Sequence, residues 1–109
     1  MTETVIREGD KVATFINILE LKDPAKQQDL IDVLNEGTEK VIKHQPGFIS
    51  VNLFASRDGS RVVNLAQWSS PDDIKAVATN PDAQVFAKKA AELATPAPGP
   101  YSVASVTQA

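Results

Sequence analysis

Three local patterns in the sequence predict an α+β domain built on a split βαβ unit. Two alternating apolar runs, 48–56 and 61–68, flank Asp58-Gly59, a strong signal for a β-hairpin. Three helix starts, each a capping residue followed by proline, are spread along the chain. The resulting order, β-α-β-β-α-β with one extra helical segment, is that of ferredoxin-like folds, with helices on one face of an antiparallel sheet.

The first half of the chain predicts a strand followed by a long helix. Segment 12–21 is rich in β-branched and apolar residues, as strands are. A helix is expected to begin at Asp23-Pro24 and to end near His44, because Pro46-Gly47 follows. Its apolar stripe has spacings of four, three and four: Leu30, Leu34, Gly37 and Val41.

The second half predicts two further helices and a last strand after the hairpin. A short helix begins at Ser70-Pro71, and a longer one begins at Asn80-Pro81 and stops before Thr95. The proline-rich stretch 95–100 is expected to be a connector, and 101–107 is expected to be the fourth strand. The chain of 109 residues is therefore expected to form one domain over 11–109, preceded by a tail over 1–10.

Composition excludes several classes of function. The formal charge is −3, with no basic run and only 6% aromatic residues, so nucleic acid is not expected as a partner. No signal-peptide core and no apolar run of membrane-spanning length are present, which predicts a soluble, cytoplasmic protein. The sequence has no cysteine, so it offers no disulfide, thiolate nucleophile or sulfur metal ligand.

The hairpin places one amide among apolar side chains. If Asp58-Gly59 is a two-residue loop, Arg57 pairs with Ser60 and Leu53 lies opposite Asn64. The face that carries Asn64 is otherwise apolar: Ile49, Val51, Leu53, Ala55, Val62, Ala66 and Trp68. A buried amide without a partner costs about 1–3 kcal/mol, so Asn64 needs either a structural partner or a ligand.

The opposite hairpin face is neither fully polar nor fully apolar. It should carry Phe48, Ser50, Asn52, Phe54, Arg61, Val63, Leu65 and Gln67. Within this face Phe54, Val63 and Leu65 form an apolar patch, and such exposed patches usually mark an interface. The sequence therefore predicts a homodimer in which two sheets pack against each other.

Three motifs together resemble the antibiotic biosynthesis monooxygenase family. They are Pro46-Gly47-Phe48, the Asp58-Gly59 hairpin and Val62-Val63-Asn64-Leu65-Ala66-Gln67-Trp68. The resemblance covers the chain from Val12 to Val106. Within the family, the chain is similar to small anthrone oxygenases of aromatic polyketide pathways, which have an Asn-x-Ala-x-Trp strand in this place. It implies a dimeric α+β barrel of ferredoxin-like subunits and oxygenation without flavin, haem or metal.

The resemblance also implies roles for particular residues. The matching Asn and Trp of the family are those most often assigned to catalysis, which makes Asn64 and Trp68 the candidate catalytic pair. A neutral amide in an apolar pocket can stabilise a developing oxyanion, and an indole can stack on the ring or donate a hydrogen bond. Leu53 and Ala66, beside Asn64 on the same face, are expected to contact the substrate.

Each candidate also has a structural interpretation. Asn64 could tie the sheet to a loop, and Trp68 could be plain core. Gly37 either opens room over Asn64 or lets helix and sheet approach closely. Asn17, mid-strand, is a candidate second amide in the pocket. His44 is the only histidine and a possible general base, although a helix C-terminus also favours an imidazolium there.

The sequence departs from the family pattern at two places. Ile74 stands where anthrone oxygenases tend to have a tyrosine. These enzymes also tend to have an arginine on the last helix, where this chain has Lys88 and Lys89. Tyr101, the only phenol, lies elsewhere. Haem-degrading relatives need an axial histidine on a late helix, and this chain has none, so haem degradation is not expected.

The sequence as a whole favours a cofactor-independent monooxygenase that oxidises a hydroxylated aromatic, anthrone- or quinol-like, to a quinone with molecular oxygen. Two alternatives stay open. One is a non-catalytic dimeric barrel that binds a small apolar ligand or a partner protein. The other is a different chemistry of the same family, such as breakdown of a small signalling molecule.

Overall fold

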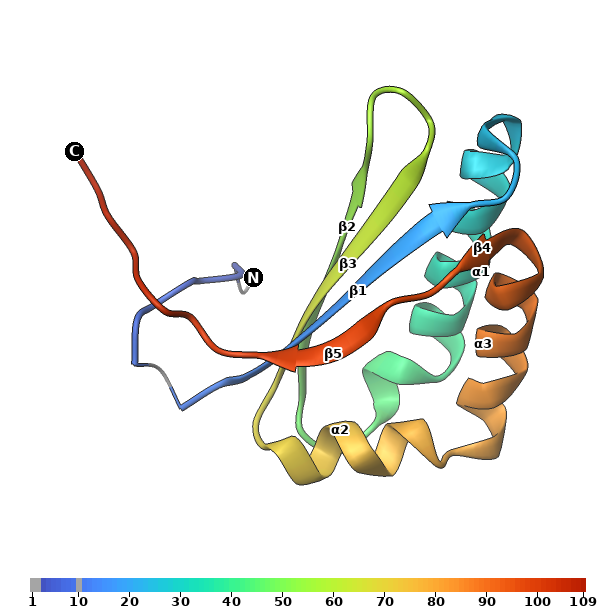
Figure 1. Cartoon of the computed structure of the whole chain (residues 1–109). Coiled ribbons are helices and arrows are strands. Elements are labelled where there is room, and N and C mark those ends of the chain that lie inside the picture. The colour runs from blue at the N-terminus through green and yellow to red at the C-terminus, as the bar shows by residue number, and fades with distance from the viewer. Residues whose placement is uncertain (1–2, 10) are drawn as a thin grey trace.

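A computed structural model describes residues 3–9 and 11–109 as one antiparallel sheet with all three α-helices on one face (Figure 1). The strands are β1 (Ala13–Leu21), β2 (Phe48–Ala55), β3 (Arg61–Trp68), β4 (Ala94–Thr95) and β5 (Pro98–Tyr101). The helices are α1 (Gln27–Lys40), α2 (Pro71–Ala78) and α3 (Pro81–Leu93), with 3-10 turns at Pro24–Lys26 and Ile42–His44. The strand order is β2-β3-β1-β4, with β5 also paired to β1. The predicted ferredoxin-like fold is confirmed.

The predicted capping residues close the helix starts. Ser70 Oγ accepts the Asp73 amide at 3.3 Å, and Asn80 Oδ1 accepts the Asp82 amide at 2.9 Å. Asp23 caps the 3-10 turn in the same way. Each side chain satisfies an amide that has no partner within the first helical turn, which is why α2 and α3 begin where the sequence predicts. The helix predicted to begin at Asp23-Pro24 starts instead with a 3-10 turn, and α1 itself begins at Gln27 without a side-chain cap.

Gly37 allows two helices to pack closely. A Cβ atom on Gly37 would lie 2.9 Å from Cγ of Phe86, so no larger residue fits on α1 beneath this ring of α3. The close approach is thus between helix and helix, rather than between helix and sheet. Beside it lies the core cluster, which comprises Leu19, Leu21, Leu30, Val62, Ala90 and Ala94.

The hairpin turn differs from the predicted two-residue loop, while the register is as predicted. Leu53 pairs with Asn64, but the last ladder pair is Ala55 with Val62. The turn spans Ser56 to Gly59, whose amide donates to the Ser56 carbonyl at 3.1 Å. Gly59 alone has a positive φ in this turn, whereas a two-residue type I′ loop needs positive φ at both central residues.

Asp58 organises this turn through its carboxylate. The carboxylate accepts from Ser60 Oγ at 2.7 Å, from the Ser60 amide at 2.9 Å and from Ser56 Oγ at 2.9 Å. These bonds, with the Ser60 hydroxyl contributing most, lower the pKa of Asp58 from 3.8 to about 2. The ionised form is therefore favoured in the folded protein.

The Asp58 carboxylate should make the stability of the wild-type protein pH-dependent in acid. A lowered pKa in the folded state gives a stabilisation that is complete above about pH 4 and is lost as the pH falls through about 2. Asp58→Asn should therefore be less stable than wild type at neutral pH, with the difference shrinking toward pH 2. Urea unfolding at several pH values checks this; a difference that stays constant across the range would contradict it.

A β-bulge changes the register at the start of β2. The sequence predicts Ile49 opposite Trp68, but Phe48 is the partner of Trp68, and the ladder shifts between Phe48 and Ser50. Phe48 therefore lies on the side of Trp68, not on the opposite face, and the two rings meet edge to face at 5.5 Å. Bulges insert one residue without a marked sequence signal, so strict alternation misses them.

The last strand lies earlier than the sequence predicts. Segment 101–107 has no strand beyond Tyr101, and the edge position is taken by β4 and β5 instead. Pro98 and Pro100 lie opposite Asn17 and Phe15 of β1. Prolines are tolerated on an edge strand, because they need not donate a hydrogen bond to a further neighbour. The proline-rich stretch is thus part of the sheet.

Gly47 lies just before β2, where the backbone passes very close to the first turn of α2. Its φ is +81°, and an added Cβ would lie 2.0 Å from Oδ2 of Asp73. Its carbonyl accepts the Ser69 amide at 2.8 Å, which holds the start of α2 against β2. Both the backbone conformation and the space therefore require glycine here.

Gly47→Ala should destabilise the fold by roughly 2–4 kcal/mol, from left-handed strain together with displacement of Asp73. Gly9→Ala is a matched control, because Gly9 also has positive φ but has nothing within 4 Å of an added Cβ. Its cost should be about 1–2 kcal/mol, from the left-handed strain alone. Chemical denaturation of both variants measures the difference, and equal losses would show that the contact with Asp73 is unimportant.

The sheet face away from the helices is apolar over much of its area. We define the helix-free patch as Ile16, Ile18, Phe54, Val63 and Leu65. Phe54 is 55% exposed and Ile18 is 38% exposed. The described N-terminal segment 3–9 and the C-terminal segment 102–109 lie on this side of the sheet (Figure 1). Among the described residues, no helix is long and apolar enough to cross a membrane.

Candidate active site

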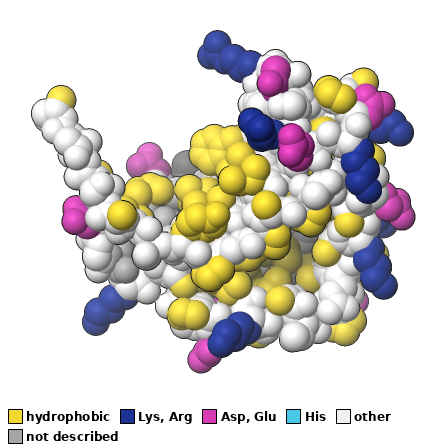
Figure 2. Space-filling model, viewed as in Figure 1, with side chains coloured by type: hydrophobic (Ala, Val, Ile, Leu, Met, Phe, Trp, Pro, Cys, Tyr) yellow, Lys and Arg dark blue, Asp and Glu magenta, His cyan; other side chains and the backbone are white. Residues whose placement is uncertain are grey.

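A cavity of about 410 Å³ lies between the sheet and the three helices. Its floor comes from β1, β2 and β3, and its walls come from α1, α2, α3 and the segment around β5. The space-filling view shows a hollow with hydrophobic side chains between the strands and the helices (Figure 2). The volume falls within the range of small-molecule sites.

Two asparagines from neighbouring strands line the floor. Asn64 of β3 and Asn17 of β1 are direct partners in the antiparallel ladder, so their side chains project from the same face. Oδ1 of Asn64 is buried and has no hydrogen-bond partner among the described residues. Oδ1 of Asn17 accepts the Ala97 amide at 3.0 Å. The structure thus brings both sequence-predicted amides into one cavity.

Trp68 forms the end of the floor beside α2. It is only 3% exposed, lines the cavity, and packs edge to face against Phe48. Its indole N–H makes no hydrogen bond to the described residues. Ala66, 2% exposed, lies between Trp68 and Asn64 on the same strand face and is a small residue. A flat ring can therefore lie over Ala66 with Trp68 at its edge.

The helical wall is apolar. Gly37 and Thr38 of α1, Ile74 of α2 and Phe86 of α3 line it. Thr38 Oγ1 donates to the Leu34 carbonyl at 2.8 Å, so the Thr38 hydroxyl has no proton left to donate to a ligand. Ile74 thus lies in the cavity as an apolar side chain and offers it no hydroxyl group. Lys89 does not line the cavity; its Nζ lies 5.1 Å from the Phe86 ring centre, on the wall.

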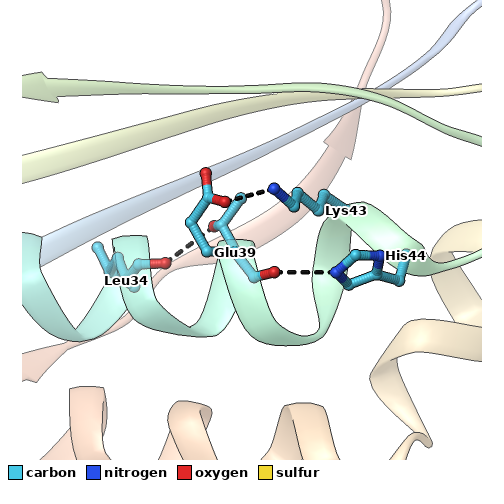
Figure 3. Close-up of polar contacts among 5 residues, drawn as sticks. Leu34, Glu39, Lys43 and His44 are labelled. Carbon is cyan, nitrogen blue, oxygen red and sulfur yellow. Dashed lines mark hydrogen bonds and ion pairs between the residues drawn. The ribbon is translucent and has the colours of Figure 1, made fainter.

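Two predicted site residues lie outside the cavity. Leu53 shares a face with Asn64 but does not line the cavity, and Val51 of the same strand lines it instead. His44 is exposed at the end of its 3-10 turn, and its Nε2 lies 3.1 Å from the Glu39 carbonyl oxygen (Figure 3). This placement does not support His44 as a base for a ligand in the cavity.

Several lining residues escaped the sequence reasoning. Phe15 lies two residues before Asn17, so the period of a strand could have placed it on the same face. Thr38 follows Gly37 directly, and only the helix orientation shows that both reach the cavity. Phe86 belongs to the apolar stripe of α3, and the sequence does not distinguish a stripe that lines a cavity from one that packs in the core.

The cavity lining carries no charged side chain among the described residues. Nor do these residues contain a cluster of three or more His, Cys, Asp or Glu that could hold a metal ion. The side chains of the lining that can donate a hydrogen bond to a ligand are the two carboxamides and the indole, because the Thr38 hydroxyl already donates to Leu34. In apolar surroundings, neutral N–H donors of this kind stabilise negative charge on a ligand oxygen.

Comparisons with known proteins agree with this geometry. The family model described as antibiotic biosynthesis monooxygenase matches residues 14–89. Tetracenomycin-F1 monooxygenase of Streptomyces glaucescens is 44% identical over 71 residues, which are 65% of this chain. The matched segment spans 62% of the length of that relative.

Solved structures share the fold. The ActVA-Orf6 monooxygenase of Streptomyces coelicolor, in complex with nanaomycin D, superposes with a TM-score of 0.78 at 24% identity, covering 91% of this chain and 94% of that one. SnoaB, a cofactor-independent oxygenase from Streptomyces nogalater, superposes with a TM-score of 0.70 at 23% identity, covering 87% and 95% of the two chains.

Proposed function

Because the chain belongs to the antibiotic biosynthesis monooxygenase family, we propose that it is a cofactor-independent monooxygenase acting on a hydroxylated polycyclic aromatic, anthrone- or quinol-like. The observation that carries the proposal is Asn64. Its amide lies on the floor of an apolar cavity, and it has no structural partner among the described residues. The similarity to a tetracenomycin-F1 monooxygenase supports the choice of a polycyclic aromatic substrate.

The chemistry requires little of the protein apart from binding and electrostatics. Oxygen is a triplet, and a cofactor ordinarily supplies the one-electron steps. The anion of an anthrone or quinol is electron-rich enough to donate an electron to oxygen itself. Conversion of a ring CH₂ to C=O releases four electrons, which reduce O₂: one oxygen atom enters the carbonyl, and the other leaves as water.

The named residues have separate roles in this proposal. Asn64 Nδ2 donates to the substrate oxygen that carries the negative charge, and it needs no counterion of its own. The Trp68 indole lies at the edge of the ring, where it makes an edge-to-face contact or donates a second hydrogen bond. The helical wall around Phe86 and Ile74 excludes bulk water, which strengthens both interactions.

The helix-free patch supports a homodimer. The patch is contiguous across β1, β3 and β2, since Ile16 pairs with Leu65, and Val63 pairs with both Ile18 and Phe54. An apolar sheet face of this kind is ordinarily covered in a folded protein, and a second copy would pack its own patch against it. The catalytic cavities would lie on the outer sides of the two sheets, each within one subunit.

Oxygen uptake by the purified protein tests the proposed function. A panel should contain anthrones and phenols with an unsubstituted para position, of one to four rings, each also incubated without protein. We expect protein-dependent uptake with the multi-ring substrates, at a rate that saturates with substrate. Tight binding of these compounds without any increase in oxygen uptake would instead indicate a non-catalytic binding protein.

A further inference from the structure

The two amides of the cavity floor have complementary unused groups. Asn17 and Asn64 are ladder partners, so their Cβ atoms are separated by about 4.5–5.5 Å and their amides can reach each other. Asn64 has an acceptor, Oδ1, that is buried and has no partner within residues 3–9 and 11–109. Asn17 has a donor, Nδ2, that makes no hydrogen bond to the described residues.

Asn17 is oriented by a backbone group, whereas Asn64 is not. The Ala97 amide donates to Asn17 Oδ1 at 3.0 Å, and this contact decides which end of the Asn17 amide points toward β5. No comparable bond to the described residues holds the Asn64 side chain, so its amide group can rotate by about 180° and exchange the positions of Oδ1 and Nδ2. Only one of the two orientations presents N–H to the cavity; the other presents Oδ1, which repels a ligand oxyanion.

We propose that Asn17 is a positioning residue that orients Asn64. When a ligand occupies the cavity, Asn17 Nδ2 donates to Asn64 Oδ1, and Asn64 then presents Nδ2 to the ligand oxygen. The resulting chain runs from the Ala97 amide through Asn17 and Asn64 to the ligand, and each bond polarises the next. The inference rests on the proposed function, because it needs an anionic or partly anionic oxygen at the end of the chain.

Asn17→Asp separates this role from a purely structural one. Aspartate keeps the acceptor for Ala97 but replaces the donor with a second acceptor, so Asn64 should turn its Nδ2 toward residue 17. We expect kcat to fall by roughly 10- to 100-fold. Because the new carboxylate also faces the ligand oxygen, it should raise KM and lower the melting temperature as well, so the decisive comparison is the one in the Asn64→Ala background. Asn80→Asp is the matched control: it keeps its capping bonds to Asp82 and Ala83 and loses only the donor to Gln45, outside the cavity. Its kcat should be unchanged.

The Asn64→Ala background provides the sharpest test. If Asn17 acts through Asn64, then Asn17→Asp should reduce kcat by a clearly smaller factor once Asn64 is alanine, because only the direct repulsion by the new carboxylate remains. If Asn17→Asp slows oxidation by the same factor in both backgrounds, Asn17 acts independently of Asn64, and the proposal is wrong. A wild-type kcat for Asn17→Asp would also overturn it.

A readout without turnover separates this inference from the proposed function. The side-chain ¹⁵N–¹H signals of Asn64 can be followed while 1-hydroxyanthraquinone, which is not oxidised, is titrated into wild type and Asn17→Asp. We expect a ligand-induced shift of the Asn64 signals in wild type that is lost in the variant. Equal shifts in both proteins would refute the positioning role, whereas absence of oxygen uptake by wild type would refute the proposed function alone.

Discussion

Asn64→Ala should slow substrate oxidation by about 10²-fold while the protein stays as stable as wild type. The rate effect is the low end of what loss of one oxyanion donor costs. The stability effect is small because the Asn64 side chain has no hydrogen bond to lose among the described residues, where its Oδ1 is already buried without a partner. Removing an unsatisfied polar atom is neutral or slightly stabilising. Steady-state kinetics and thermal melting on the same sample measure both quantities.

The opposite pattern would identify Asn64 as a structural residue. In that case alanine would leave the hydrogen-bonding partner of the Asn64 amide unsatisfied, and the free energy of unfolding would fall by about 1–3 kcal/mol. Turnover per folded molecule would stay normal. Trp68→Phe is a useful companion, because it keeps an aromatic ring beside Phe48 and removes only the indole donor. We expect it to reduce kcat by less than Asn64→Ala does.

Leu65→Glu should convert a dimer into monomers. Leu65 lies at the middle of the helix-free patch, between Ile16 and Asn52 in the sheet. A carboxylate buried there without a partner would weaken association by about 3–5 kcal/mol, or more than 10²-fold. Sedimentation at micromolar concentration should give twice 11.7 kDa for wild type and a mass near 11.7 kDa for the variant.

Val85→Glu provides the control for this substitution. Val85 is 50% exposed on α3, on the helical side of the sheet, so the same change in charge should leave the dimer intact. A wild-type protein that sediments as a monomer would contradict the dimer directly. A dimer that survives Leu65→Glu would show that the subunits meet through another surface.

The sequence predicts the frame of this fold because its signals are local. Capping oxygens followed by proline mark the helix starts, and their hydrogen bonds form within one turn. The register of the hairpin follows from its turn residues and from alternation, so the pairing of Leu53 with Asn64 is correct even though the turn itself is longer. An amide on an apolar face was sufficient to locate the floor of the cavity.

The remaining features depend on contacts between distant parts of the chain. The bulge at Ile49 aligns Phe48 with Trp68, and nothing in the β2 sequence marks it. The strand made by Pro98 and Pro100 exists because β1 offers an open edge, although its composition is typical of a linker. The cavity volume follows from how closely α1 and α3 approach, which Gly37 controls and a helical wheel does not show.

Oxidation under ¹⁸O₂ by protein that has been exhaustively dialysed against chelator tests the central claim most directly. The product and the solvent water are analysed together with the metal and flavin content of the sample. The proposed chemistry predicts undiminished activity, one ¹⁸O atom in each new carbonyl and the second in water. Activity that disappears on chelation and returns with a metal or a flavin, or a carbonyl oxygen drawn from unlabelled water, would contradict it.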